Sequence, residues 1–498
     1  MLPDPTPSAQ ASTPLLDALR ISAQTPNAPF YAPGHKRGRG VSGRLTDLFG
    51  AQVFQADLPE LPELDNLFAP QGAIRQAQEL AAEMFGADRT WFLMNGSTCG
   101  VIAAILATCA PGDKIVLPRN IHQSAISGLI LAGAIPVFLN PEYDRTLDIA
   151  HSITPDSVAA ALAQHPDAKA VMMVYPTYFG VCGHLEAIAQ IVHQHHIPLL
   201  VDEAHAPHFA FHADLPTPAL AAGADLSVQS THKVLSAMTQ AAMLHIQGNR
   251  IDGDRLTQAL SLVQSTSPSY LLLASLDAVR YQMATQGTEL MQQTLKRADW
   301  ARSHINQIPK LSTLNPKQAG SPGFFALDRT RLTVTVSELG LDGFTADKIL
   351  HHQFGVTAEL PSLQHLTFII SLGNTDTDIE QLLQALQGLT ERQKSKEIQK
   401  SKESSTFNLQ PSTFNLIPTP SLSPRDAFFA PTESLPVEQA VSRISAELVC
   451  PYPPGIPVLM PGEAIAPESL AYLQQVLASG GMISGCADPT LKTLKVVR

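Results

Sequence analysis

Ser230-Thr231-His232-Lys233 is the stretch of sequence on which the prediction of the fold depends. It follows Asp202-Glu203-Ala204-His205, and these four residues end an apolar run from Ile197 to Val201. A short apolar run bounded by polar residues is typical of a buried strand. The sequence therefore places a carboxylate at the end of a strand and, further along the chain, a lysine that follows hydroxyl side chains.

Asp202 followed by Lys233 is the arrangement that an enzyme dependent on pyridoxal phosphate (PLP) needs. The lysine forms a Schiff base with the aldehyde of the cofactor. The aspartate pairs with the pyridinium nitrogen and keeps it protonated, so that the ring can accept electrons. A lysine in such a stretch, taken alone, is more often a surface residue, so the prediction depends on its companions.

One companion is Asn95-Gly96-Ser97-Thr98, which follows a strand candidate and opens a helix. The backbone N–H groups at this helix start and the hydroxyl groups of Ser97 and Thr98 would cradle a phosphate. The alternative is an ordinary capped helix. A phosphate-binding helix start, a strand-end aspartate and a later lysine nevertheless occur in the expected order within one region.

Histidines allow two further interpretations. His122 ends the stretch Arg119-Asn120-Ile121-His122 after another strand candidate, where it could stack on a cofactor ring or serve only a structural role. A metal cluster is the second interpretation, drawn from Asp202, Glu203, His205, His208 and His212. Their spacing is not diagnostic of a metal site, and we expect no metal.

Helical and strand-like segments alternate from about residue 74 to residue 282. This alternation predicts an α/β fold with a mostly parallel sheet flanked by helices. The expected domains are a polar, Pro-rich arm (1–28), a PLP-binding major domain (29–290), a small α/β domain (291–390), a linker (391–424) and a C-terminal α+β domain (425–498). Short repeats, such as Lys394-Ser395-Lys396-Glu397 recurring at residues 400–403, define the linker.

Composition excludes several classes of protein. The 498-residue chain is 44% hydrophobic and 15% charged, which suits a globular enzyme. Its net charge of -11 argues against nucleic acid as a partner. No apolar run reaches the ~18 residues that span a bilayer, and the first residues do not resemble a signal peptide. Five scattered cysteines are expected to be reduced thiols, so we predict a cytoplasmic protein without a membrane partner.

The chain resembles the ornithine/lysine/arginine decarboxylase family, PLP enzymes with the aspartate aminotransferase type of fold. Matching stretches extend over most of the chain: Pro33-Gly34-His35-Lys36-Arg37-Gly38, Leu64-Asp65-Asn66-Leu67, Asn95 to Thr98, Arg119 to His122, Asp202 to His205, Gln229 to Lys233, Gln264 to Tyr270, Arg443 to Glu447 and Pro451 to Pro457. Only about 30 residues precede Pro33, so the chain resembles the short form, which lacks an N-terminal receiver-like domain.

The resemblance implies a role for each matching residue. Lys233 is the Schiff-base lysine, Asp202 binds the pyridinium nitrogen and His122 stacks on the ring. The phosphate is held by Ser97, Thr98, Ser230 and His232, and His205 contacts the ring hydroxyl. Gly96 and Ala204 are further cofactor-binding residues. Thr266, within Ser265-Thr266-Ser267, reaches the phosphate from a neighbouring subunit, so a homodimer or higher homo-oligomer is expected. Either Lys233 or His232 returns the proton to the substrate.

The resemblance also implies the reaction, which is decarboxylation of a basic amino acid. We expect arginine, converted to agmatine in polyamine biosynthesis, with lysine and ornithine as alternatives. Glu359 and Glu447 are the candidates to bind the distal cationic group of the substrate. A PLP aminotransferase, with Arg329 or Arg331 as the clamp for the substrate carboxylate, is the alternative of another class, followed by a non-catalytic PLP-binding protein.

Overall fold

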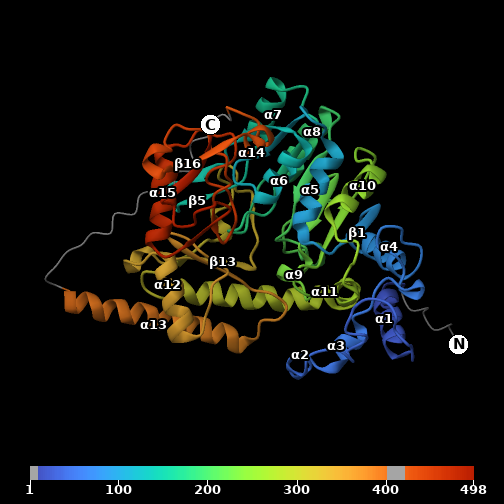
Figure 1. Cartoon of the computed structure of the whole chain (residues 1–498). Coiled ribbons are helices and arrows are strands. Elements are labelled where there is room, and N and C mark those ends of the chain that lie inside the picture. Colours follow the sequence, from blue (N-terminus) through green and yellow to red (C-terminus); the bar gives the residue numbers. More distant parts are fainter. Residues whose placement is uncertain (1–8, 401–420) are drawn as a thin grey trace. The chain divides into compact units, whose positions relative to one another are not determined.

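The computed structural model describes residues 9–400 and 421–498, with the side chains of 396–400 left out. Their helices and strands are labelled in Figure 1. They divide into two compact units. Unit 1 comprises Met1–Ala107 and Leu200–Met291, and unit 2 comprises Thr108–Leu199 and Gln292–Arg498. The 36-residue helix α11 (Tyr270–Ile305) contains the third boundary between the units, between Met291 and Gln292.

Unit 1 carries the strands that lead into the two diagnostic motifs. Strand β8 (Leu199–Asp202) is parallel to β9 (Leu226–Gln229), and β9 pairs antiparallel with β10 (Ala242–Ile246), which pairs antiparallel with β1 (Arg89–Leu93). All residues of β8, β9 and β10 are buried, including the polar residues Ser227, Gln229 and His245.

Helix α5 (Gly96–Thr108) packs unusually close to this sheet because it contains Gly100. A β-carbon at Gly100 would lie 2.7 Å from side-chain atoms of both Leu93 and Val228. The helix is apolar all round from Cys99 to Ala107, as expected for a buried helix, whereas its first turn carries Ser97 and the exposed Thr98. Its N-terminus is therefore fixed beside the strands that carry the site.

The expected polar arm (residues 1–28) contains a helix that packs into unit 1. Helix α1 (Pro14–Gln24) buries Leu15 and Leu19, which are one helical turn apart. The N–H of Leu15 donates to Asp277 Oδ2 at 2.9 Å. Arg280 donates to Asp277 at 2.7 Å and to the Gln10 carbonyl at 2.7 Å, and both members of the ion pair are fully buried. Residues 1–8 of this arm lie outside the described residues.

The first part of unit 2 continues the β-α alternation. Strand β2 (Lys114–Pro118) lies between β3 (Ile135–Leu139) and β6 (Ala170–Val174), and both pairings are parallel. The helices here are α6 (Gln123–Ala132), α7 (Pro155–Gln164) and α8 (Leu185–Gln194). Thr154 and Ser157 form a capping box at the start of α7.

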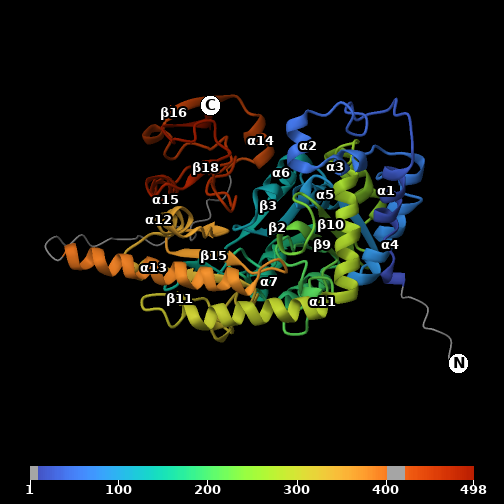
Figure 2. The ribbon, with the colours of Figure 1, turned by 90° about the horizontal axis from the view of Figure 1, so that it is seen from below.

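The small domain is an antiparallel sheet packed against helices (Figure 2). Its strand order is β11 (Ser312–Thr313), β13 (Arg331–Thr335), β15 (His365–Ile369) and β14 (Leu360–Pro361). The last turns of α11, together with α12 (Gly343–Ile349) and α13 (Asp376–Lys400), bury their apolar side chains against it.

Helix α13 is capped at its start and extends into the expected linker. The N–H of Asp378 donates to Thr375 Oγ1 at 3.2 Å, so Thr375 is the cap. The helix also continues to Lys400, so residues 391–400 of the expected linker are helical. Residues 401–420 of that linker lie outside the described residues.

The last part of unit 2, residues 421–498, is an α+β arrangement. Strand β16 (Thr432–Pro436) pairs with β19 (Thr493–Val497), and β17 (Cys450–Tyr452) pairs with β18 (Met482–Ser484), both antiparallel. Helices α14 (Pro424–Phe429) and α15 (Pro467–Ala478) complete it. The remaining short elements of the described chain are α2 (Gly43–Phe49), α3 (Ala51–Ala56), α4 (Ala73–Phe85), α9 (Thr231–Val234), α10 (Gly253–Val263), β4 (Tyr143–Asp144), β5 (Ile149–Ala150), β7 (Val181–Cys182) and β12 (Ala326–Leu327).

All five cysteines are free thiols, and four of them are buried. In the described parts of the chain, every helix is too short or too polar to cross a bilayer.

Candidate active site

Asp202 and the stretch Ser230–Lys233 follow two neighbouring strands at the same edge of the sheet in unit 1. Strands β8 and β9 are parallel, and Asp202 lies opposite Val228 in their register. Because parallel strands end on the same side, the carboxylate and the lysine-bearing turn come together there, as the sequence predicted. The N–H of Glu203 donates to the Val228 carbonyl at 2.9 Å and continues the pairing one residue further.

Lys233 lies on the single-turn helix α9, and its Nζ is 3.0 Å from Nε2 of His205. His205 is almost fully buried, at 4% exposure. An ammonium group can only donate, so Nε2 accepts and the ring hydrogen of a neutral His205 is on Nδ1. The contact between Lys233 and His205 thus links the end of β8 to the turn after β9.

The Asp202 carboxylate is buried and receives little compensation from backbone donors. The N–H of Ala204 donates to Oδ1 at 3.2 Å. Burial raises the pKa of Asp202, while the positive charge of Lys233 and this N–H lower it in part. A buried carboxylate beside a lysine is suited to hold a cationic group such as a protonated ring nitrogen.

Hydroxyl groups meet at the start of α5. Ser230 Oγ donates to Ser97 Oγ at 2.6 Å, although the two residues are 133 positions apart in the sequence. Gly96 adopts a positive φ of 73° and turns the chain into the helix, and Thr98 is exposed. The Thr231 hydroxyl is buried and has no hydrogen-bond partner among the described residues. These polar groups fit a phosphorylated cofactor, because a phosphate would supply acceptors for them.

His232 is held in place by two contacts with the carbonyl of Ala241, the residue before β10. Its N–H is 3.3 Å from the Ala241 carbonyl, and Nδ1 is 2.9 Å from the same oxygen. A ring nitrogen that faces a carbonyl must carry the hydrogen, so Nε2 is the acceptor of the neutral ring.

Glu203 is a structural residue that the sequence suggested only as a metal ligand. Its carboxylate is fully buried and accepts from Ser227 Oγ at 2.6 Å, Gln229 Nε2 at 2.9 Å and the Ala219 N–H at 2.8 Å. Burial raises its pKa to about 7, against the lowering effect of these donors. Gln229 also lies 3.2 Å from His245, so a buried polar chain extends behind the site.

The segment Ser265-Thr266-Ser267 is exposed and lies next to the helix start. The N–H of Ser265 is 3.3 Å from Asn95 Oδ1. The contact of Thr266 with the phosphate of a neighbouring subunit stays a prediction.

Three predicted site residues belong to unit 2. His122 caps α6, with Nδ1 accepting from the Ser124 N–H at 3.2 Å. Glu359 is exposed at the start of β14. Glu447 is buried, and its two oxygens accept from the N–H groups of Ala487 and Lys495 at 2.6 and 2.8 Å. These contacts give Glu447 a structural role within the C-terminal domain, while the roles of all three at the cofactor or substrate stay predictions.

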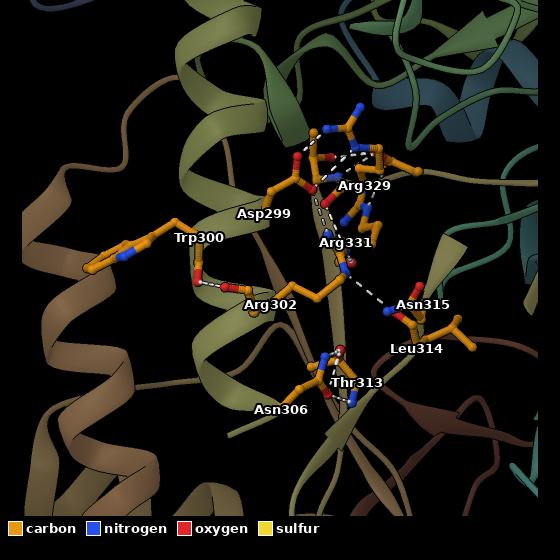
Figure 3. Close-up of polar contacts among 12 residues, drawn as sticks. Asp299, Trp300, Arg302, Asn306, Thr313, Leu314, Asn315, Arg329 and Arg331 are labelled. Carbon is orange, nitrogen blue, oxygen red and sulfur yellow. Dashed lines mark hydrogen bonds and ion pairs between the residues drawn. The ribbon is translucent and has the colours of Figure 1, made fainter. Parts of the chain in front are cut away.

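The arginines considered for an aminotransferase clamp are already neutralised (Figure 3). Arg329 forms an ion pair with Asp299 of α11. Arg331 is fully buried with Asp328 3.6 Å away, and burial lowers its pKa. Arg302 lies between them and donates to the carbonyls of Arg329 and Arg331 at 2.9 and 2.8 Å. This cluster stabilises the small domain and gives no support to a carboxylate clamp.

The candidate metal ligands are not arranged as a site. Within residues 9–400 and 421–498, no three His, Cys, Asp or Glu side chains gather in a way that could hold a metal ion. His205 instead faces Lys233.

Comparison with known proteins agrees with this geometry. Residues 13–378 match the family model of the Orn/Lys/Arg decarboxylase major domain, and residues 407–487 match the C-terminal domain of the same group. Arginine decarboxylase from Bacillus subtilis (strain 168) is 39% identical over 490 residues, which cover 98% of this chain and 99% of that protein.

Solved structures are similar in fold. Lysine decarboxylase A from Pseudomonas aeruginosa aligns with a TM-score of 0.84 at 23% identity, covering 98% of this chain and 81% of that one. Ureidoglycine-glyoxylate aminotransferase from Bacillus subtilis aligns with a TM-score of 0.52 at 14% identity, over 64% of this chain and 85% of that one. The predicted α/β fold of the aspartate aminotransferase type is confirmed.

Proposed function

The chain belongs to the Orn/Lys/Arg decarboxylase family, and we propose that its substrate is arginine, which it converts to agmatine and carbon dioxide. As a member of this family it is a PLP-dependent amino-acid decarboxylase. The choice of arginine is supported by the 39% identity to an arginine decarboxylase over nearly the whole chain, whereas lysine decarboxylase A shares 23%. Lysine and ornithine are the alternatives.

The observation that carries the assignment of the site is the contact between Lys233 and His205 beside the buried Asp202. When bound, PLP supplies an electron sink for the electrons that the departing carboxylate leaves behind. In our proposal Lys233 bonds the cofactor aldehyde, and Asp202 keeps a negative charge against the ring nitrogen. The low polarity around Asp202 strengthens that interaction, because charges attract more strongly away from water.

The phosphate is assigned to the helix start and the turn before Lys233. Gly96, Ser97 and Thr98 supply N–H and hydroxyl donors, and Ser230 and His232 approach from the other side. Support comes from the 2.6 Å contact between the hydroxyls of Ser97 and Ser230, which brings the two segments together. His122 is assigned to the face of the ring and Thr266 to the phosphate of a second subunit, so we propose a homodimer or a larger homo-oligomer.

Loss of the carboxylate requires that a proton be delivered to the substrate α-carbon. We assign this proton to Lys233, because His205 at 3.0 Å can exchange a proton with its Nζ. His232 is less suited, since its Nδ1 already faces the Ala241 carbonyl. Glu359 is assigned to the guanidinium of the substrate, since both oxygens of Glu447 already accept backbone N–H groups.

We also propose that the enzyme acts in the cytoplasm, where its five free thiols would stay reduced. Its product agmatine would enter polyamine biosynthesis.

The test is direct. The purified protein with PLP is incubated separately with arginine, lysine and ornithine, each labelled in the carboxyl carbon, and the released carbon dioxide and the amine are identified. We expect agmatine, formed with a kcat/KM at least about tenfold above that for the other two substrates, a preference of roughly 1.4 kcal/mol. Faster formation of cadaverine or putrescine would assign the enzyme to lysine or ornithine. Absence of labelled carbon dioxide from all three would contradict decarboxylation.

A further inference from the structure

A turn in the C-terminal domain lies directly against the loop that carries His122. The turn comprises Pro451–Pro457, and both segments belong to unit 2. The N–H of Gln123 donates to the Gly455 carbonyl at 3.1 Å. Tyr178 Oη donates to the Pro454 carbonyl at 3.0 Å. The main chain of the turn therefore receives hydrogen bonds from two places near the ends of β2 and β6.

Arg119 fixes the same turn from the other side of the loop. Its guanidinium donates to the Pro457 carbonyl at 2.6 Å and to the Val458 carbonyl at 3.0 Å, and it forms a buried ion pair with Glu463 at 3.0 Å. Such hydrogen bonds and the ion pair stabilise a buried guanidinium, although Nε of Arg119 has no hydrogen-bond partner among the described residues. The contact between the turn and the loop is therefore fixed in position.

One side of the turn borders a cavity and is not closely packed. Pro453, Pro454 and Ile456 line a cavity of about 70 Å³ together with side chains that include Tyr178 and Phe179. Because the turn borders an unfilled space there, its position depends on the polar contacts described above.

The imidazole of His122 is confined between Ser124 and this turn. Nδ1 accepts from the Ser124 N–H, so the hydrogen of the neutral ring is on Nε2. On the opposite edge of the ring, a β-carbon at Gly455 would lie 3.2 Å from His122 Nε2 and 3.1 Å from Gln123 Nε2. Gly455 also has a φ of +81°, which strains any other residue. A side chain at this position would push against the ring.

We propose that the turn Pro451–Pro457 positions His122, and that Gly455 is the residue that leaves room for its imidazole. The proposal rests on the proposed role of His122 at the cofactor ring. The C-terminal domain then contributes to the active site by holding a ring-contacting residue, without itself supplying a group that touches the substrate. Gly455 is thus a positioning residue.

The test compares two glycine substitutions in the full-length protein. Gly455→Ala introduces the methyl group beside His122. Gly340→Ala is the matched control, because Gly340 has a similar φ of +71° and no atom within 4 Å of the new β-carbon. For Gly455→Ala we expect a changed visible circular dichroism of the bound cofactor and a dissociation constant for PLP raised on the order of tenfold. For Gly340→Ala both should match the unsubstituted protein.

Two further variants make the outcome decisive. His122→Ala should change the dichroism in the same direction and at least as much. If His122→Ala has an effect and Gly455→Ala has none, the positioning role is wrong while the proposed function stands. If His122→Ala itself has no effect, the proposed role of His122 fails and the inference fails with it. Should Gly455→Ala not fold, Tyr178→Phe removes the hydroxyl that donates to the Pro454 carbonyl and should give a smaller change of the same sign. An unchanged spectrum in Tyr178→Phe would then count against the proposal.

Discussion

Nζ of Lys233 lies 3.0 Å from Nε2 of His205. The two residues come from separate motifs, at the ends of the neighbouring parallel strands β8 and β9. Their contact shows that the two motifs meet at one point, and it supplies the lysine with a neighbour that can take up or return a proton.

Removal of the amine should abolish the lysine-bound form of the cofactor. We expect Lys233→Ala to lose the visible absorbance band of the lysine-bound cofactor while still binding PLP through the phosphate contacts. Lys317→Ala, at an exposed lysine of unit 2, is the control and should keep the band. Absorbance and PLP content are measured after gel filtration. A band that persists in Lys233→Ala would assign the covalent bond to another residue.

Replacement of the imidazole next to Lys233 should slow proton transfer. His205→Phe keeps a buried ring but removes the nitrogen that faces Nζ, so we expect kcat to fall about 10²- to 10⁴-fold with a small change in KM. His212→Gln, at a partly exposed histidine seven residues later, should retain full activity. Steady-state kinetics over a range of pH would check both. Equal kcat values for His205→Phe and the unsubstituted enzyme would exclude a role in proton transfer.

Glu203 should make the stability of the protein depend on pH. Its pKa in the folded state is about 7, above its ordinary value of 4.5, so the folded protein binds the proton more tightly than the unfolded chain. This contribution is fully present below pH 4.5 and is lost as the pH rises to 7, by up to about 3 kcal/mol. Glu203→Gln, which cannot ionise, should show a weaker decline in melting temperature between pH 5 and pH 8. Parallel pH profiles for the two proteins would contradict the assignment.

Glu359 should contribute to substrate binding rather than to chemistry. In Glu359→Gln the guanidinium of the substrate loses a charged hydrogen-bond acceptor, which is worth about 1.5–3 kcal/mol. We therefore expect KM for arginine to rise about 10- to 100-fold with kcat nearly unchanged. Glu338→Gln, at another exposed glutamate of the small domain, is the control. An unaltered KM in Glu359→Gln would remove this residue from the site.

Arg302 should be important for the stability of the small domain (Figure 3). It donates to the carbonyls of Leu314, Arg329 and Arg331, which would be left without this donor in Arg302→Met. We expect a loss of about 3–5 kcal/mol in the free energy of unfolding. Arg297→Met on the same helix removes only an exposed ion pair with Asp376 and should cost less than about 1 kcal/mol. Chemical denaturation of both variants gives the comparison.

Most of the fold could be predicted because local sequence patterns determine it. Buried strands such as β6 and β10 are short apolar runs, and Thr154 followed by Pro155 marks the start of α7. Helix α1 was missed because its burial depends on Asp277, which is more than 260 positions away. The Pro-rich composition around it indicates a loose arm, and only the tertiary contact shows otherwise.

The residues of the candidate site that belong to sequence motifs could be predicted. Lys233 and Asp202 stand in motifs whose order already implies a shared edge of the sheet. The role of Glu203 could not be read in this way. Its partners Ser227 and Gln229 are set by the pairing of β8 with β9, and a glutamate beside a strand-end aspartate carries no local signal of them.

The fully buried ion pair of Asp277 and Arg280 limits which substitutions these positions can accept. Loss of either partner leaves an uncompensated charge in the interior and removes hydrogen bonds from the first turn of α1 or the segment before it. In a set of related sequences the two positions should therefore covary, changing together or not at all. Where both are apolar, the residues corresponding to 10–15 should have changed as well, because their backbone groups would need other partners.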